Sequence, residues 1–144
     1  MKGPIQSVEI SYLVHATEDQ AKVEGAVQGI LGISSPPVIQ VLEGHFGNKI
    51  VHAQHHLTGG AASSALSNLA NAMSTEAKDE LLGDLDQMID DHEALHIRLD
   101  KQSFLTGKLA LAKEDTVRVL VKPRLFLMKG EARELFRKAL GACK

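Results

Sequence analysis

The sequence is poor in cysteine and lacks tryptophan, which limits the kinds of site that it can form. It contains one cysteine, Cys143, and no tryptophan among its 144 residues. A single cysteine excludes an internal disulfide and any zinc site built on cysteines. Cys143 is also a poor nucleophile candidate, because a catalytic thiolate needs a base held firmly beside it. We therefore expect a protein of a reducing compartment that does not use cysteine chemistry.

Long apolar runs and an export signal are lacking as well. Runs such as Leu125 to Met128 are only a few residues long, whereas a membrane-spanning helix needs about 20 apolar residues. The first residues, Met1 to Pro4, lead directly into an alternating strand pattern without the apolar core of a signal peptide. We therefore expect a cytoplasmic protein that contacts no membrane.

Charge is unevenly distributed, although the net charge is only −2. Between Glu76 and Glu93, eight acidic residues stand against Lys78 alone. From Lys101 onward, eleven basic residues stand against four acidic ones. A polyanion is therefore expected to approach the C-terminal third of the chain and to avoid the acidic segment.

A length of 144 residues predicts a single domain over residues 1–144, and hydrophobic periodicity predicts that it is an α+β protein. Thr17 and Gln20 are expected to form a capping box before the first helix. A hairpin in place of regular βαβ alternation favours a mainly antiparallel sheet backed by helices. Strands are expected at residues 8–16, 38–43, 49–57, 95–100 and 117–122, and helices at 21–31, 61–73, 75–89 and 130–140, with a short helical turn at 103–105.

Gly47 and Asn48 predict a two-residue hairpin turn, because Gly accepts the positive φ of such turns. Counting outward from this turn places Phe46 opposite Lys49 and Val41 opposite Gln54. The same register places Glu43 opposite His52, which suggests a metal hydrolase in which Glu43, His52 and His56 hold zinc. Four residues of extended strand separate the two histidines by roughly 13 Å, too far for one ion. We therefore expect no metal and no cofactor, and interpret these histidines as polar residues of an exposed sheet face.

Thr58, Gly59 and Gly60 precede a predicted helix, whose N-terminus attracts anions. The segment lacks the lysine of a P-loop and the spacing of a dinucleotide fingerprint. Small residues at this place favour close helix packing over an anion site.

Two polar segments carry a resemblance to a known family. Residues 43–48 (Glu-Gly-His-Phe-Gly-Asn) and 98–102 (Arg-Leu-Asp-Lys-Gln), followed by Gly107 and the strand at Val117, resemble the archaeal predicted exosome subunits, which belong to a wider RNA-binding group. The resemblance extends from about Val8 to Leu140. It implies an archaeal cytoplasmic source and a role in RNA processing. It also implies a curved, mainly antiparallel sheet of about five strands with helices on one side, similar to the ribosomal protein that binds the small RNA of the large subunit.

Basic residues of the last two predicted strands agree with this resemblance. Arg98, Arg118 and Lys122 lie opposite the aliphatic register of their strands, so their charged ends are expected in solvent. Lys101 and Arg124 are expected to extend this surface beyond the strand ends. With only five aromatic residues in the chain, we expect phosphate and shape contacts and no base stacking. The predicted RNA-binding residues are Arg98, Lys101, Gln102, Arg118, Lys122, Arg124, His45 and Asn48.

The sequence therefore predicts a non-catalytic RNA-binding accessory protein of archaeal RNA processing. RNA and exosome or other RNA-processing proteins are the expected partners, and a homodimer stays open. The first alternative is a protein-interaction module that docks on a larger complex through its charge-free Ser/Asn helix or its acidic helix. The second alternative is the histidine-based metal hydrolase.

Overall fold

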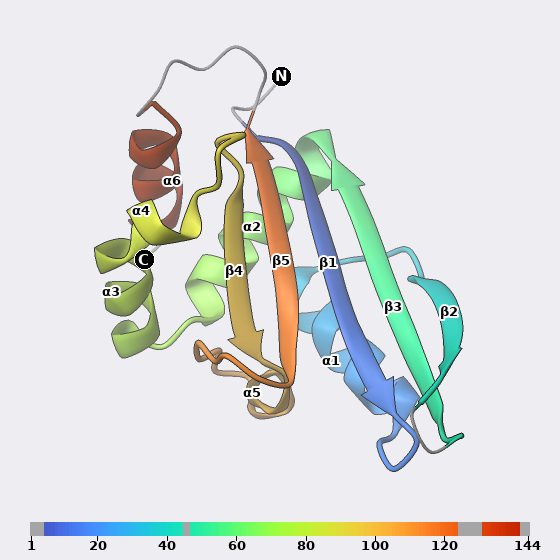
Figure 1. Cartoon of the computed structure of the whole chain (residues 1–144). Coiled ribbons are helices and arrows are strands. Elements are labelled where there is room, and N and C mark those ends of the chain that lie inside the picture. Colours follow the sequence, from blue (N-terminus) through green and yellow to red (C-terminus); the bar gives the residue numbers. More distant parts are fainter. Residues whose placement is uncertain (1–4, 45–46, 124–130, 142–144) are drawn as a thin grey trace.

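The computed structural model describes residues 5–44, 47–123 and 131–141 of the chain. Within these residues, five strands form one antiparallel sheet in the order β2-β3-β1-β5-β4 (Figure 1). The α+β class and the antiparallel sheet of five strands are thereby confirmed. The strands are β1 (Ile5–His15), β2 (Val38–Glu43), β3 (Lys49–Thr58), β4 (Leu95–Asp100) and β5 (Thr116–Pro123).

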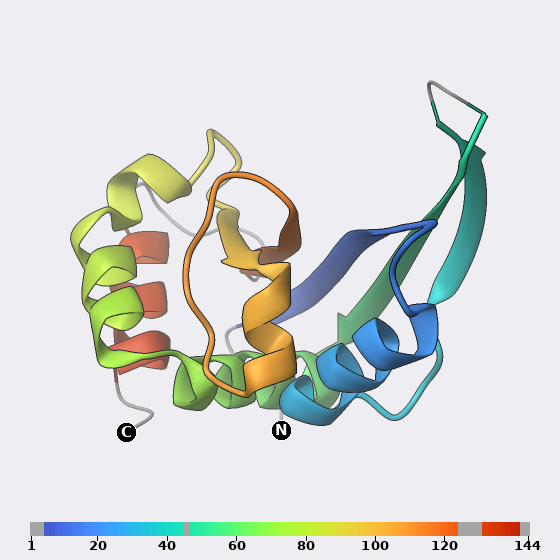
Figure 2. The same ribbon diagram turned by 90° about the horizontal axis from the view of Figure 1, so that it is seen from below.

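Helices cover one face of this sheet. Figure 2 shows α1 and α2 beneath that face, and the β2–β3 end of the sheet curving away from them. No helix of the described residues crosses the other side of the sheet at β1, β3 and β5 (Figures 1 and 2). We call this side of all five strands the open face. The similarity to the ribosomal protein stays a prediction. The helices are α1 (Gln20–Leu31), α2 (Gly59–Ala72), α3 (Thr75–Gly83), α4 (Leu85–Met88), α5 (Lys101–Thr106) and α6 (Glu131–Gly141).

The alternating pattern of β1 explains why this face is covered. Val8, Ile10, Tyr12 and Val14 are at most 2% exposed, and they alternate with the polar or exposed side chains of the open face. Burial of apolar surface contributes roughly 25 cal/mol per Å², so the helices assemble on the aliphatic side. None of the helices in the described part of the chain is long and apolar enough to cross a membrane.

Two helix boundaries differ from the expected ones. The N-cap of α1 is Asp19, whose side chain accepts a hydrogen bond from the Lys22 N–H at 3.2 Å, and not Thr17. The helix expected at residues 75–89 is divided into α3 and α4 at Asp84. Gly83 and Asp84 are weak helix formers, and they stand at the break.

The register predicted for the hairpin is wrong by three residues. Glu43 pairs with Lys49, and His52 pairs with Gln40. The turn is longer than predicted, because the Gly44 N–H donates to the Asn48 carbonyl at 2.6 Å. Gly47 has the expected positive φ of 80°. All six residues of β2 are exposed, so burial does not fix its register and the turn geometry decides it.

Close helix packing does not explain the two glycines that begin α2. A Cβ atom added at Gly59 or Gly60 would meet no other atom within 4 Å. Gly59 has a φ of 57°, a conformation that glycine adopts at little cost. The need for this backbone conformation accounts for Gly59.

Candidate nucleic-acid interface

A row of polar side chains crosses four strands of the open face. The register places Ser11 of β1 opposite Gln54 of β3 on one side and opposite Arg118 of β5 on the other. Arg118 in turn lies opposite Arg98 of β4. We call these four residues the central row. Their positions follow from the strand alternation, since the flanking residues of β4 and β5, such as Ile97 and Val117, are buried.

Arg98 and Arg118 form a pair of like charges in the central row. Both are exposed, and residues directly opposite on antiparallel strands have Cα atoms about 5 Å apart. No carboxylate of the described residues forms an ion pair with either guanidinium. Like charges at directly opposite positions destabilise a sheet. The pair is therefore unfavourable in the protein alone, and an anion on the open face would compensate it.

Three shallow hollows surround this arginine pair. One of about 290 Å³ is lined by the central row together with Glu9 and His96. A second of about 430 Å³ shares Ser11 and Arg118 with it, and a third of about 750 Å³ shares Arg98 and His96. The three hollows therefore adjoin one another at the arginine pair, and the third extends to the acidic side chains of Glu80, Asp84 and Asp90.

Lys113 is a residue of this surface that the sequence analysis missed. It is exposed and lines both the second and the third hollow. The loop that carries it folds back along β4, because the Ala112 N–H donates to the Arg98 carbonyl at 3.1 Å and Leu111 bridges Leu99. No periodic pattern marks a loop residue, so only a contact between distant segments identifies it.

Lys122 lies on the open face as predicted, but its charge is partly compensated. Its ammonium lies 3.3 Å from a carboxylate oxygen of Glu9. The same Glu9 side chain lies 3.5 Å from His56. Lys122 is therefore a weaker attractor of phosphate than the two arginines.

Lys101 is not on the surface, and its predicted exposure is wrong. Its side chain is 1% exposed. The ammonium lies 2.7 Å from Glu18 and 2.8 Å from Asp115, and donates a third bond to the Leu13 carbonyl at 2.7 Å. The chain turns into α5 at Lys101 and does not continue the strand, which directs the side chain inward. Gln102 is exposed, and its amide lies 3.4 Å from Glu18.

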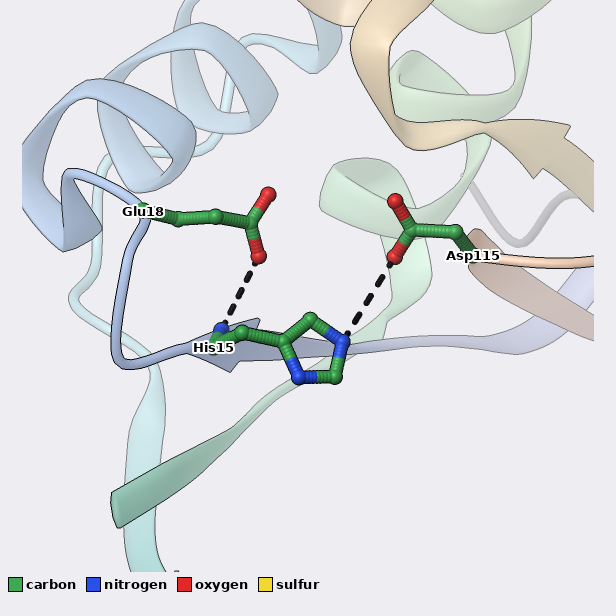
Figure 3. A group of neighbouring side chains, drawn as sticks. All are labelled: His15, Glu18 and Asp115. Atoms are coloured by element: carbon green, nitrogen blue, oxygen red, sulfur yellow. Dashed lines mark hydrogen bonds and ion pairs between the residues drawn. The ribbon is translucent and has the colours of Figure 1, made fainter. Parts of the chain in front are cut away.

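The two carboxylates around Lys101 lie beside His15, and the three residues are of the types that can bind a metal ion. Figure 3 shows them. His15, Glu18 and Asp115 each offer a ligand atom, all within 4.8 Å of one another. Dashed lines in Figure 3 join the Glu18 carboxylate to the backbone N–H of His15, and the Asp115 carboxylate to the His15 ring. The two distances are 2.9 Å and 3.8 Å. The Lys101 ammonium already pairs with both carboxylates, so a metal ion would have to displace it.

The zinc ligands considered from the sequence do not converge. His52 and His56 both lie on the open face, separated by Gln54. Glu43 pairs with Lys49 and therefore shares its face of the sheet. Lys49 and His52 are three residues apart on β3, so their side chains point to opposite faces. Glu43 thus lies on the face opposite to the open face. Alternation along the strands thus separates the carboxylate from the imidazoles.

We expect the purified protein to hold no stoichiometric zinc after dialysis. The histidines of the open face supply too few convergent ligands, and Lys101 occupies the place of a cation beside Glu18 and Asp115. Elemental analysis measures the zinc content per chain. One zinc per chain that is lost in a His52→Ala variant would restore the hydrolase hypothesis.

The other predicted residues lie apart from the central row. Asn48 is exposed at the turn between β2 and β3, and His45 and Arg124 lie outside the described residues. Tyr12, Phe104 and Phe136, the aromatic residues within the described part of the chain, are at most 2% exposed. They therefore offer no platform for base stacking.

The surfaces considered for protein docking are partly engaged within the chain. On the Ser/Asn side of α2, the Asn68 amide donates to the Leu31 carbonyl at 3.0 Å. On the acidic segment, Asp86 forms an ion pair of 3.2 Å with Arg133 of α6. Both contacts stabilise the packing of helices on one another.

Comparisons with known proteins find similar proteins in archaea. A family model described as RNA binding matches residues 7–123. An uncharacterised protein of Methanocaldococcus jannaschii is 25% identical over 135 residues, which cover 88% of this chain and 90% of that protein. A crystal structure of a DUF54 protein from Archaeglobus fulgidus is 28% identical with a TM-score of 0.74, covering 96% of this chain and 99% of that one. A DUF54 protein from Methanothermobacter thermautotrophicus is 27% identical with a TM-score of 0.75, covering 94% and 98%.

Proposed function

The chain belongs to the RNA-binding family whose model it matches, and from this premise we propose that it is a non-catalytic RNA-binding accessory protein. It acts in archaeal RNA processing, in the cytoplasm, and contacts RNA through the open face of its sheet. The observation that carries the proposal is the exposed pair of Arg98 and Arg118, which has no acidic partner among the described residues.

Phosphate groups are the part of RNA that this pair suits. A guanidinium binds phosphate through two parallel hydrogen bonds, and two of them side by side reach neighbouring oxygens of one backbone. Lys113 adds a third cation, which lines two of the hollows beside the pair. Ser11 and Gln54 bring hydroxyl and amide groups to the centre, which suit the 2′-hydroxyls that distinguish RNA from DNA.

The family resemblance also supports an association with the exosome. The proposal is that RNA bound on the open face is delivered to a processing complex, whose surface meets the protein elsewhere. Co-purification of the wild-type chain with exosome subunits after ribonuclease treatment tests this association separately from RNA binding. Loss of the subunits after that treatment would mean that RNA alone connects them.

The test of RNA binding is a double substitution, Arg98→Ala with Arg118→Ala. We expect weaker binding of a labelled RNA hairpin, measured by fluorescence anisotropy across a salt series. Each lost phosphate contact reduces the slope of log affinity against log salt by about 0.7 to 0.9, so two contacts reduce it by about 1.4 to 1.8. The fold is expected to survive, because exposed substitutions change stability by less than about 0.5 kcal/mol.

A matched control removes two charges elsewhere. Arg137 and Lys138 are exposed on α6, so the Arg137→Ala, Lys138→Ala variant has the same net charge as the test variant. It is expected to keep the salt slope of the wild type. An unchanged slope in the Arg98/Arg118 variant would refute the proposed surface and favour the docking module.

A further inference from the structure

The edge strand β2 is unusually apolar and uncovered. Val38 is 75% exposed, Ile39 41%, Val41 58% and Leu42 38%. Within the described residues, β2 pairs with β3 alone, so its outer edge is free of strand partners. Alternation along the strand directs Val38 and Leu42 to the open face, and Ile39 and Val41 to the other.

The usual protections of an edge strand are lacking here. Natural sheets block their edges with charged side chains, prolines or bulges. Residues 38–42 (Val-Ile-Gln-Val-Leu) carry no charge and no proline, and the pairing of β2 with β3 runs from Val38 to Glu43 without a shift in register. An edge of this kind is suited to accept another strand.

The sequence of β2 is complementary to itself. Two copies of a strand can extend one sheet when a twofold axis perpendicular to the sheet relates them. This axis leaves each side chain on its own face. Two residues can therefore pair only if they are an even number of positions apart in the sequence. With the axis at Gln40, Val38 lies opposite Leu42, and Ile39 lies opposite Val41. Moving the axis to Val41 would place Ile39 opposite Glu43 and Gln40 opposite Leu42. With the axis at Gln40, the two copies of Gln40 face each other and all other pairs between residues 38 and 42 are apolar. No other position of the axis has this property.

We propose that β2 is a self-association surface, on which the β2 strand of a second copy of this chain pairs antiparallel about Gln40. The two sheets then join into one of ten strands, and their open faces lie on the same side. The single strand pair makes this contact small. Contacts below about 1,200 Å² belong to weak or transient complexes, so the dimer is expected to depend on protein concentration.

The first experiment measures self-association by sedimentation equilibrium over a concentration series. Val41→Lys places a charge at the centre of the contact and is expected to leave the protein monomeric. The fold should survive, because Val41 is already 58% exposed. The control is Leu105→Lys on α5, where a leucine 41% exposed lies outside β2. This variant is expected to dimerise like the wild type, and equal dimerisation by the Val41→Lys variant would overturn the proposal.

The second experiment tests the register. In a Cys143→Ser background, Gln40→Cys is expected to form a disulfide-linked dimer upon mild oxidation, because self-paired positions have Cα atoms within disulfide reach. Val38→Cys is expected to crosslink poorly alone and well when mixed with a Leu42→Cys chain. If Val38→Cys crosslinks with itself as fast as Gln40→Cys, the proposed pairing is wrong.

Discussion

Replacing Lys101 by methionine is expected to lower the free energy of unfolding by about 2 kcal/mol. Breaking a buried ion pair by removing one partner costs about 3–5 kcal/mol. The smaller figure applies because Asp115 is 48% exposed and Glu18 17%, so water rehydrates the abandoned carboxylates. Methionine keeps most of the aliphatic part of the side chain, so the decrease in the free energy of unfolding measures the contribution of the ammonium and its three polar contacts. Urea denaturation at neutral pH measures it.

A second variant separates charge from packing. Lys101→Met combined with Glu18→Gln removes the cation together with one of its carboxylates, and is expected to be less destabilised than the sum of the two single changes. Additive effects would mean that Lys101 and Glu18 do not stabilise each other.

The contacts of Lys101 with Glu18 also predict that the stability of the fold depends on pH. Burial alone would raise the pKa of Glu18, but the His15 N–H and the Lys101 ammonium outweigh it and hold this pKa below its usual value of 4.5. The folded state thus binds this proton less readily than the unfolded state. The stabilisation is complete above pH 4.5 and is lost as the pH falls through the lowered pKa. In the Lys101→Met variant, this loss should be smaller.

A second strong effect is expected at His55, which lies inside the protein. His55 is 2% exposed and stacks on Tyr12 with ring centroids 6.2 Å apart. Neither ring nitrogen has a hydrogen-bond partner within the residues that the structure describes. Burial lowers the pKa of His55 below 6.5, and the nearby Glu24 opposes this only in part.

Stability should therefore fall as the pH drops below about 6.5, because only the unfolded state then protonates this histidine. One proton gives a slope of at most about 1.4 kcal/mol per pH unit, which continues down to the lowered pKa of the folded state. His55→Leu is expected to flatten this part of the curve. Thermal or urea unfolding between pH 7 and pH 5 measures it, with His92→Ala as the exposed control. A slope as steep in the His55→Leu variant as in the wild type would assign the acid response to other groups.

Hydrophobic periodicity predicted the strands well, because the burial of their aliphatic side chains decides where they form and which face is covered. Val117, Val119 and Val121 must be buried together, and this requirement directs Arg118 and Lys122 to the other face. The same logic placed Arg98 correctly. The pairing of Arg98 with Arg118 was beyond this reasoning, because a strand pattern states which face a residue occupies and not which residue lies beside it.

Where burial exerts no such control, prediction from the sequence failed. The register of β2 depends on the turn between Gly44 and Asn48, since no residue of that strand is buried. The burial of Lys101 depends on Glu18 and Asp115, which come from distant segments and meet only in the folded chain. Charged residues are usually exposed, so a buried lysine is the exception that sequence patterns do not reveal.

The central position of β1 has a consequence for synthesis on the ribosome. β1 is made well before its partner β5, which follows about 100 residues later, and Ser11 of β1 pairs with Arg118 of β5. At about 5 to 20 residues per second, one edge of β1 waits roughly 5 to 20 seconds for its partner. During this interval the nascent chain exposes an unpaired edge of β1, the kind of edge at which other chains can pair. The arginine pair forms only after β5 has been made, so an unfinished chain that ends before Thr116 cannot present it to RNA.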